Sequence, residues 1–210
     1  MAGGQTGQHS ERSDEMKRKL LLIGAGGHAQ SCMDVIEQTD AFNIVGLFDV
    51  AEKVGLSVSG YPIIDTDDHI GDYVADDVSF LITLGQIKSA ALRKKLYTRL
   101  KELKADIATV VSPLAYISAH AKIGQGTIVM HHAFVNAGAV IGENCILNTK
   151  SLIEHNAVIG DNCHIATAAV VNGDAKIGDE SFIGSNAVVV QGSVLENGGF
   201  VKAGERYFHG

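Results

Sequence analysis

The segment ILNTKSLIEHNAVIGDNCHIATAAVV, residues 146–171, repeats one pattern every six residues. Each repeat has an aliphatic side chain at a fixed position and a small side chain four residues later. Period-six repetition is the signature of a hexapeptide β-helix, in which each hexapeptide forms one side of a triangular coil. The aliphatic series continues unbroken in both directions and comprises Val111, Ile117, Ile123, Val129, Val135, Ile141, Leu147, Ile153, Ile159, Ile165, Val171, Ile177, Ile183, Val189 and Leu195.

The repeat has a direct physical explanation. A short strand points its aliphatic residue into the core, and the chain then turns a corner that accommodates a small side chain. Three hexapeptides make one coil of about eighteen residues, so residues eighteen apart stack on one another. Gly124, Gly142, Gly160, Gly178 and Gly184 follow the aliphatic residue, where we expect turning backbone. The sequence therefore predicts a left-handed parallel β-helix of nearly five coils, in an all-β domain over residues 109–210.

The composition limits the classes of function. Of the 210 residues, 46% are hydrophobic and 20% charged, ordinary values for a globular protein. The net charge of −7 disfavours nucleic acid or an anionic membrane as a partner. No apolar run approaches the ~18–20 residues of a membrane span, and no signal sequence is apparent. Cys32, Cys145 and Cys163 are interpreted as buried thiols, so we expect a cytoplasmic protein. Residues 1–17 are polar and Gly-rich, which predicts a disordered leader.

The N-terminal half alternates strands with helices. Apolar runs predict buried strands at 19–23, 44–48 and 78–84, and a helix follows the first strand. A second helix is predicted over 89–103, with Leu92, Leu96, Leu100 and Leu103 on its apolar face. This alternation predicts a small Rossmann-like α/β domain with a parallel sheet over residues 18–108. Its last strand leads into the first coil of the β-helix.

The loop GAGGHA, residues 24–29, joins the first strand to the first helix. Gly24, Gly26 and Ala29, with Asp49 at the end of the next strand, match the dinucleotide-binding fingerprint. Glycines at such a loop let the backbone approach a phosphate at the helix N-terminus. The domain has about half the length of a full dinucleotide fold. We therefore expect a nucleotide other than NAD, the alternative being a tight turn without a ligand.

Two histidines of the repeat region, His155 and His164, stand out by position. His155 lies at an outward or corner position, two residues after core Ile153. His164 precedes core Ile165 and so points outward. An outward apolar stripe on a solenoid needs a partner, and a homotrimer is the expected answer. The two histidines lie on opposite sides of one coil, so we expect them to meet across a subunit interface. The residues equivalent to His164 are apolar: Val140, Ile146, Leu152, Val158 and Val170.

A metal site is the alternative use of these histidines. The γ-type carbonic anhydrases bind zinc on a hexapeptide β-helix with a ligand set that includes two histidines five residues apart, and no such pair occurs here. His131 and His132 are adjacent, so their side chains diverge. The sequence predicts no metal.

The two halves together resemble a known family. A small domain with Gly-x-Gly-Gly-His, joined to an uninterrupted hexapeptide helix with Ile-Glu-His, is similar to the bacterial nucleotide-sugar N-acetyltransferases over residues 19–206. These enzymes transfer acetyl from acetyl-CoA to the 4-amino group of UDP-, GDP- or dTDP-linked 4-amino-4,6-dideoxyhexoses. The sialic-acid-cluster O-acetyltransferases are close relatives. The resemblance implies an acetyl-CoA-dependent N-acetyltransferase of polysaccharide or glycan biosynthesis.

The resemblance also assigns roles to residues of this chain. His155 would be the catalytic base, because an imidazole that titrates near neutrality suits an amine nucleophile. His164 would lie at the acetyl-CoA thioester, the Gly173 amide would face the oxyanion, and Ser185 would line the coenzyme A groove. The expected residues of the nucleotide-sugar site are Gly26, Gly27, His28, Asp49 and Gly85.

Two departures from the family pattern leave alternatives open. Several relatives carry a carboxylate directly after the catalytic histidine, where this chain has Asn156. An amide orients the ring without supplying charge, so His155 could instead chiefly position the substrate. Relatives also extend the helix by a further coil with a Gly-x-Pro-Ala-Lys-like tail, which is absent here. The competing functions are sugar O-acetylation, a non-enzymatic trimeric sugar-nucleotide-binding scaffold and an NAD-linked reductase. Because no cysteine suits an acyl intermediate, we expect direct attack in a ternary complex.

Overall fold

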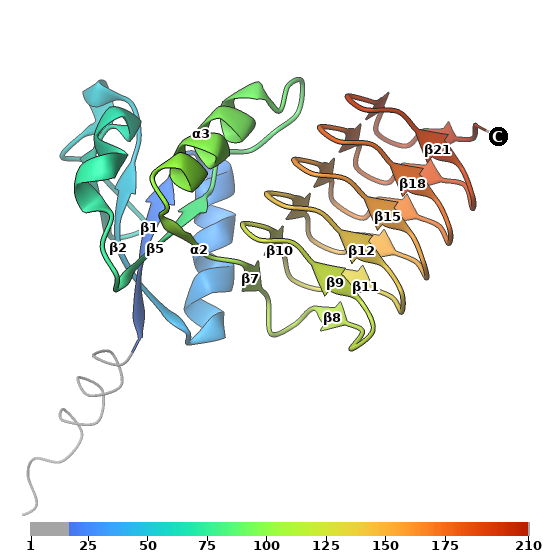
Figure 1. Cartoon of the computed structure of the whole chain (residues 1–210), viewed down its shortest axis with the longest axis horizontal. Helices are drawn as coiled ribbons and strands as arrows, with labels where there is room; N and C mark the ends of the chain where they lie inside the picture. Colours follow the sequence, from blue (N-terminus) through green and yellow to red (C-terminus); the bar gives the residue numbers. More distant parts are fainter. Residues whose placement is uncertain (1–16, 210) are drawn as a thin grey trace, which may run out of the picture.

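The computed structural model describes residues 17–209, which form an α/β part and a β-helix side by side (Figure 1). The predicted combination of a small Rossmann-like sheet and a left-handed parallel β-helix is confirmed. Apart from Lys17, the expected disordered leader lies outside the described residues. Within residues 17–209, no helix is long and apolar enough to cross a membrane.

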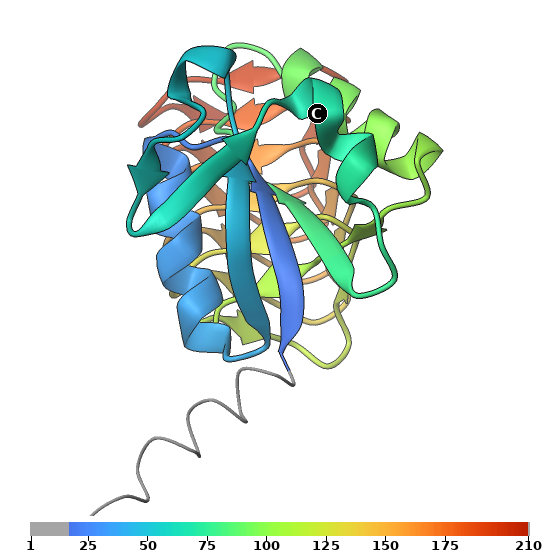
Figure 2. The same cartoon turned by 90° about the vertical axis from the view of Figure 1, so that its left-hand side faces the viewer.

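The α/β part is built on one twisted sheet, seen face-on in Figure 2. Its strands lie in the order β3-β4-β2-β1-β5-β6, and all neighbours pair in parallel except β3 with β4. Helix α2 lies between this sheet and the β-helix (Figure 1), where its buried face shares one apolar core with β1 and the first coils. The elements are β1 Arg18–Ile23, α2 Gly27–Thr39, β2 Phe42–Phe48, η1 Ala51–Lys53, β3 Ser57–Val58, β4 Tyr61–Asp65, η2 Asp67–Tyr73, β5 Val78–Ile82, α3 Ala91–Glu102 and β6 Asp106–Ile107.

Two features of this part differ from the prediction. The hairpin β3–β4 and the following η2 were not predicted, because their apolar runs are short and interrupted by polar residues. Helix α3 begins at Ala91, and two residues of its predicted apolar face are exposed, Leu92 by 53% and Leu103 by 37%. The buried face is instead Arg93, Leu96, Tyr97 and Leu100. This spacing is also helical, but it contains an arginine that a search for apolar residues passes over.

The β-helix consists of two-residue strands, which in residues 17–209 form sheets of six, six and five strands. The repeat continues through Val201 and Tyr207, so the chain makes nearly six coils and not nearly five. The strands are β7 Val110–Val111, β8 Tyr116–Ile117, β9 Lys122–Ile123, β10 Ile128–Val129, β11 Phe134–Val135, β12 Val140–Ile141, β13 Ile146–Leu147, β14 Leu152–Ile153, β15 Val158–Ile159, β16 His164–Ile165, β17 Val170–Val171, β18 Lys176–Ile177, β19 Phe182–Ile183, β20 Val188–Val189, β21 Val194–Leu195, β22 Phe200–Val201 and β23 Arg206–Tyr207.

The corners use their residues differently from the prediction. The small residues are buried at the corners as expected, among them Ala157, Cys163 and Ala169. However, the left-handed backbone falls on the residue before the small one, such as Asn156 with φ 58°. The glycines after the aliphatic residue serve close approach between coils, since a Cβ on Gly142 would lie 2.7 Å from the carbonyl oxygen of Gly160. They are needed for space and not for turning.

The three outward sides of the β-helix have different surroundings. On the side of β7, β10, β13, β16 and β19, the outward residues pack against the α/β part, so His164 is 6% exposed. Of the outward residues expected to form one apolar stripe, only His164 and Ile146 lie on this side, and the chain's own N-terminal part covers them; the others lie on the two remaining sides, and the homotrimer stays a prediction. On the next side, the outward residues are exposed or half-buried: Tyr116, Phe134, Leu152, Val170 and Val188. On the third side, the outward residues are three valines and two lysines: Lys122, Val140, Val158, Lys176 and Val194.

A buried arginine ties the two parts together. Arg93 is 1% exposed, and its guanidinium donates to the carbonyl oxygens of Ile82 and Leu84 at 2.9 and 2.7 Å. It also donates to the backbone and side-chain oxygens of Asn144 in the β-helix, at 3.1 and 2.8 Å. Burial lowers the pKa of Arg93 to about 10, so it stays charged at neutral pH. These contacts join α3, the end of β5 and a coil.

We expect Arg93→Met to lower the free energy of unfolding by about 2–4 kcal/mol, because it leaves buried carbonyl oxygens without a donor. Urea denaturation followed by circular dichroism would measure the change. Lys95→Met, at an exposed position of the same helix, is the matched control and should have little effect. Equal stabilities of the two variants would show that Arg93 does not hold the parts together.

Candidate functional site

The glycine loop lies at the carboxyl end of β1, where parallel α/β sheets bind their ligands. Gly26 is the N-cap of α2 and provides no side-chain cap for the helix, and both Gly26 and Gly27 are exposed. The first N–H groups of α2 therefore face a site that suits an anion such as a phosphate. Gly24 has φ 107°, a conformation that favours glycine.

Asp49 supports this loop from the end of β2. Its carboxylate accepts the N–H of Ala25 and of Val50, each at 2.8 Å, and lies 3.1 Å from Nζ of Lys53 through both oxygens. Partial burial opposes ionisation, but these hydrogen bonds outweigh it and lower the pKa of Asp49. The carboxylate is thus fully engaged inside the chain. Lys53, which no sequence motif indicated, is the charged side chain next to this carboxylate.

A small pocket opens beside Asp49 at the carboxyl ends of β1 and β2. Its walls are mostly apolar, and Asp49 and Asp67 supply carboxylates. Leu92 of this pocket is exposed, although the sequence predicted it in the core. The lining residues are Ile23, Gly24, Phe48, Asp49, Val50, Asp67, Leu84, Leu92 and Leu96.

His28 and His164 meet at the junction of the two parts, with ring centroids 6.3 Å apart. Nδ1 of His164 donates to the carbonyl oxygen of Gln86 at 2.5 Å, and Nε2 accepts from Asn148 at 3.2 Å. Gly85 lies against His28, since a Cβ at Gly85 would be 3.6 Å from the Cβ of His28. Both nitrogens of His164 are thus bonded within the chain. Its expected role at the thioester stays a prediction, while the geometry assigns it to the junction.

Gln86 is the second member of this junction. It is 2% exposed, and its Nε2 donates to the carbonyl oxygen of Asn162 at 2.9 Å. Together with the bond to His164, this fixes the loop after β5 on the β-helix. The sequence motifs indicated Gly85 but not Gln86, although a polar residue in the loop after a buried strand is a recognisable signal.

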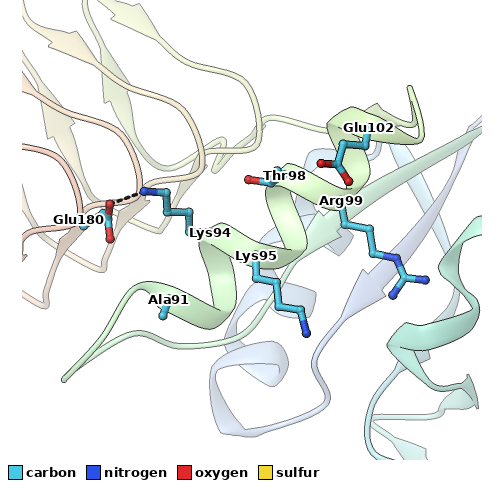
Figure 3. Close-up of a pocket in the computed structure, with 7 residues that line it drawn as sticks. All are labelled: Ala91, Lys94, Lys95, Thr98, Arg99, Glu102 and Glu180. Carbon is cyan, nitrogen blue, oxygen red and sulfur yellow. Dashed lines mark hydrogen bonds and ion pairs between the residues drawn. The ribbon is translucent and has the colours of Figure 1, made fainter.

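Helix α3 and the β-helix border a further groove (Figure 3). In the close-up, Lys94 reaches across to Glu180, and the two groups form an ion pair of 2.6 Å. None of the predicted site residues lines this groove, whose lining is Ala91, Lys94, Lys95, Thr98, Arg99, Glu102 and Glu180.

His155 lies at the corner that follows β14, exposed to solvent. Its ring lies against Gly173, one coil further along, where a Cβ would come within 2.6 Å of Nε2. Nδ1 accepts from the side-chain amide of Asn156 at 3.4 Å, and that amide also donates to Asp174 at 3.2 Å. The structure therefore brings His155, Asn156 and Gly173 together. Asp174 was missed, although the eighteen-residue stacking rule places it directly after Asn156 in the same column.

Ser185 lies apart from this group, in the corner after β19. It is half-buried, and its carbonyl oxygen accepts from the N–H of Gly204 at 2.9 Å. Within residues 17–209, no three His, Cys, Asp or Glu side chains come together in a way that could hold a metal ion.

Protein-family models match both the α/β part and the β-helix of the chain. The PglD N-terminal domain matches residues 19–100, and the bacterial transferase hexapeptide (six repeats) matches residues 138–173 and 156–191. The chain thus combines a PglD-type N-terminal domain with hexapeptide repeats of the bacterial transferase type. A search of curated protein sequences gave no match.

Solved structures of hexapeptide-repeat acyltransferases show the same architecture as this chain. The acetyltransferase domain of PglB from Neisseria gonorrhoeae is 27% identical, with a TM-score of 0.85 and 91% of each chain covered. A structure of that domain in complex with acetyl coenzyme A is 28% identical, with a TM-score of 0.83, 90% of this chain and 89% of that chain being covered. PerB from Caulobacter crescentus, in complex with CoA and GDP-perosamine, is 24% identical, with a TM-score of 0.83. The match covers 90% of this chain and 88% of that chain and shows a shared fold.

The junction histidines predict a pH-dependent stability. Burial, and next the charge of Arg93, lower the pKa of His28 to about 4; burial likewise lowers that of His164 to about 4. In the unfolded chain both take up protons near pH 6.5, so between pH 6.5 and 4 the unfolded state binds more protons. The free energy of unfolding should therefore fall as the pH drops through this window and level off below it.

Urea denaturation at several pH values would test this. The variant His164→Asn should give a shallower dependence on pH between 6.5 and 4, whereas His120→Gln, at an exposed position, should keep the slope of the parent protein. An unchanged slope in the His164 variant would contradict the assignment.

Proposed function

We propose that this acyltransferase moves acetyl from acetyl-CoA to the 4-amino group of a nucleotide-linked 4-amino-4,6-dideoxyhexose. One observation carries the proposal, namely that a single chain combines two features. The glycine loop leaves the N-terminus of α2 without a side-chain cap, which suits a phosphate, and the β-helix packed against it places His155 against Gly173. The resemblance to nucleotide-sugar N-acetyltransferases supports it. The related acetyltransferase domain of PglB, crystallised with acetyl coenzyme A, supports the identity of the donor.

The α/β part is proposed to bind the nucleotide. In this scheme Gly26 and Gly27 place the N–H groups of α2 at the phosphates. The apolar pocket beside Asp49 has the shape and character for one face of a nucleobase, with the Asp67 carboxylate as a hydrogen-bond acceptor. Lys53 stands at the edge of this pocket as a donor to the ribose or the base. His28 and Gly85 border the path from the phosphates toward the β-helix.

The β-helix is proposed to form a homotrimer with interfacial active sites. Its exposed apolar side, on which Tyr116 and Phe134 stack with ring centroids 4.6 Å apart, suits a second copy of the chain. The corner that carries His155 follows β14, a strand of that side. A second subunit there would border His155 and provide a cleft for acetyl-CoA, with Ser185 further along the coils.

The attack on the thioester is proposed to be direct. Cys32, Cys145 and Cys163 are free and buried, and burial raises the pKa of Cys32 to about 12. The hydrogen bond with Cys145, and next burial, raise the pKa of Cys163 as well. Thiols of this kind do not form an acyl-enzyme. Free buried thiols also fit the reducing environment of the cytoplasm, where we place the protein.

A thiol-release assay with acetyl-CoA and a panel of UDP-, GDP- and dTDP-linked 4-amino-6-deoxysugars tests the function. We expect turnover with one member of the panel, which would identify the nucleotide as well. Binding of acetyl-CoA without turnover would exclude these amines and indicate a hydroxyl acceptor. Absence of acetyl-CoA binding would overturn the proposed activity.

His155 is proposed as the catalytic residue at the reacting group. His155→Ala should lower kcat while the affinity for acetyl-CoA, measured by calorimetry, changes little, because the side chain acts on the reaction and not on the cofactor. His132→Asn, at a left-handed corner position elsewhere on the β-helix, is the control and should keep full activity. An unchanged kcat in the His155 variant would place the chemistry elsewhere.

A further inference from the structure

Three aspartates lie at or just after the carboxyl ends of β2 and β4, beside the small apolar pocket described above. The Asp49 carboxylate is already engaged through both oxygens. The Asp65 carboxylate is engaged as well, by the N–H of Thr66 at 2.8 Å and the hydroxyl of Tyr73 at 3.1 Å. The carboxylate of half-buried Asp67 has no hydrogen bond or ion pair within residues 17–209, although this residue lines the pocket. Asp67 is therefore the aspartate of this group that is left for a ligand.

The order of the strands sets the distance between Asp67 and the glycine loop. The Asp49 carboxylate accepts the N–H of Ala25 in that loop, and the Asp49 backbone N–H donates to the carbonyl oxygen of Asp65 at 3.2 Å. Strand β2 pairs with β1 on one side and with β4 on the other. Neighbouring strands lie about 4.8 Å apart, so the ends of β1 and β4 are roughly 10 Å apart. A ribose spans a distance of this order between a phosphate and a base, so a diphosphate at α2 would bring its base to Asp67.

The pocket wall beside Asp67 suits the flat face of a base. Phe48 and Leu96 form the buried part of this wall, with 0% and 2% of their surface exposed. Leu92 also lines the pocket and is 53% exposed, so the apolar wall continues to the surface of the protein. Apolar walls with few polar groups favour an aromatic ring over a sugar that carries hydroxyl groups. This composition favours contact between Asp67 and the edge of a base over contact with the ribose.

A free carboxylate distinguishes the common bases by their hydrogen-bonding edges. An ionised carboxylate only accepts hydrogen bonds, through two oxygens side by side. Guanine presents two adjacent donors, N1–H and the N2 amino group, which pair with both oxygens at once in a charge-assisted, bidentate contact. Uracil and thymine present one N–H between two carbonyl oxygens, so the second carboxylate oxygen would face an acceptor. Adenine and cytosine present an amino donor next to a ring nitrogen that accepts, which gives the same conflict.

We propose that Asp67 determines the base specificity of the nucleotide site and selects guanine. This inference rests on the proposed acetyl transfer and narrows the acceptor to a GDP-linked amino sugar. The selection has two parts, because Asp67 attracts both donors of guanine and leaves one carboxylate oxygen against an acceptor of each other base. A site built in this way rejects analogues that lack the second donor more strongly than an apolar pocket does.

Binding of nucleoside diphosphates tests the base specificity without a sugar or acetyl-CoA. Isothermal titration calorimetry of the parent protein with GDP, UDP, dTDP and ADP would give the four affinities. We expect GDP to bind at least about tenfold more tightly than each of the others, because each of them loses one contact and meets one repulsion. In the thiol-release panel, we expect the GDP-linked sugar to be the member that turns over.

The variant Asp67→Asn tests the pairing itself. An amide offers one acceptor and one donor, which matches xanthine, a base with a carbonyl oxygen where guanine has its amino group. We expect the variant to bind GDP at least about tenfold more weakly than the parent protein does and to prefer xanthosine diphosphate over GDP. A purely structural role of Asp67 would weaken the binding of both nucleotides alike. Asp68→Asn is the matched control and should bind GDP as the parent protein does, because the Asp68 side chain is 87% exposed and lies outside the pocket lining.

Two results would overturn the proposal and leave the proposed function in place. One is tighter binding of UDP or dTDP than of GDP by the parent protein. The other is an equal loss of GDP and UDP affinity in Asp67→Asn without a gain for xanthosine diphosphate, which would assign Asp67 to the ribose. Absence of binding by all four diphosphates would overturn both the base specificity and the proposed nucleotide site, and acetyl-CoA binding would then test the donor site on its own.

Discussion

The seam between the α/β part and the β-helix is the constraint on which the rest of the structure depends. One side of the β-helix is covered by α2 and by the loop after β5, and polar groups fix the register of this contact. Gln86 bonds to His164 and to the backbone of Asn162, while Arg93 bonds to Asn144. Because these groups are buried, each must find its partner inside the chain, and a shift of one coil would put Ile146 or Phe182 in place of His164 and leave the carbonyl oxygen of Gln86 without its donor.

This seam sets the relation between the two proposed binding regions. The strand β5 runs from the sheet toward the loop that contains Gly85 and Gln86, and Gln86 is bonded to the coil of His164. The glycine loop follows β1, which pairs with β5, so its distance from the β-helix is fixed by the same contacts. A rigid link of this kind suits a reaction in which a long substrate must reach from one part to the other.

The stacking of coils provides the second element of the site. Residues eighteen apart occupy equivalent positions on successive coils, so Asn156 and Asp174 lie next to each other with no loop between them. The close contact between coils leaves no room for a side chain at Gly173, and this absence admits the ring of His155. In this chain the nearest carboxylate in the column, that of Asp174, reaches His155 only through the amide of Asn156. This environment differs from that of a histidine with a carboxylate on the next residue. The chemistry of His155 therefore depends on both the repeat and the departures from it.

The sequence by itself determined the β-helix, the small Rossmann-like part and the residues that stack in columns, because periodic burial is a local property of the chain. It also indicated His155, Gly173 and the glycine loop, since each stands at a fixed place in a repeat or motif. Only the tertiary structure decided that His164 is buried by the chain's own N-terminal part, that Arg93 and not Leu92 lies in the core, and that Asp49 is already fully bonded. These facts depend on contacts between segments far apart in the chain, and no period along the sequence encodes such contacts.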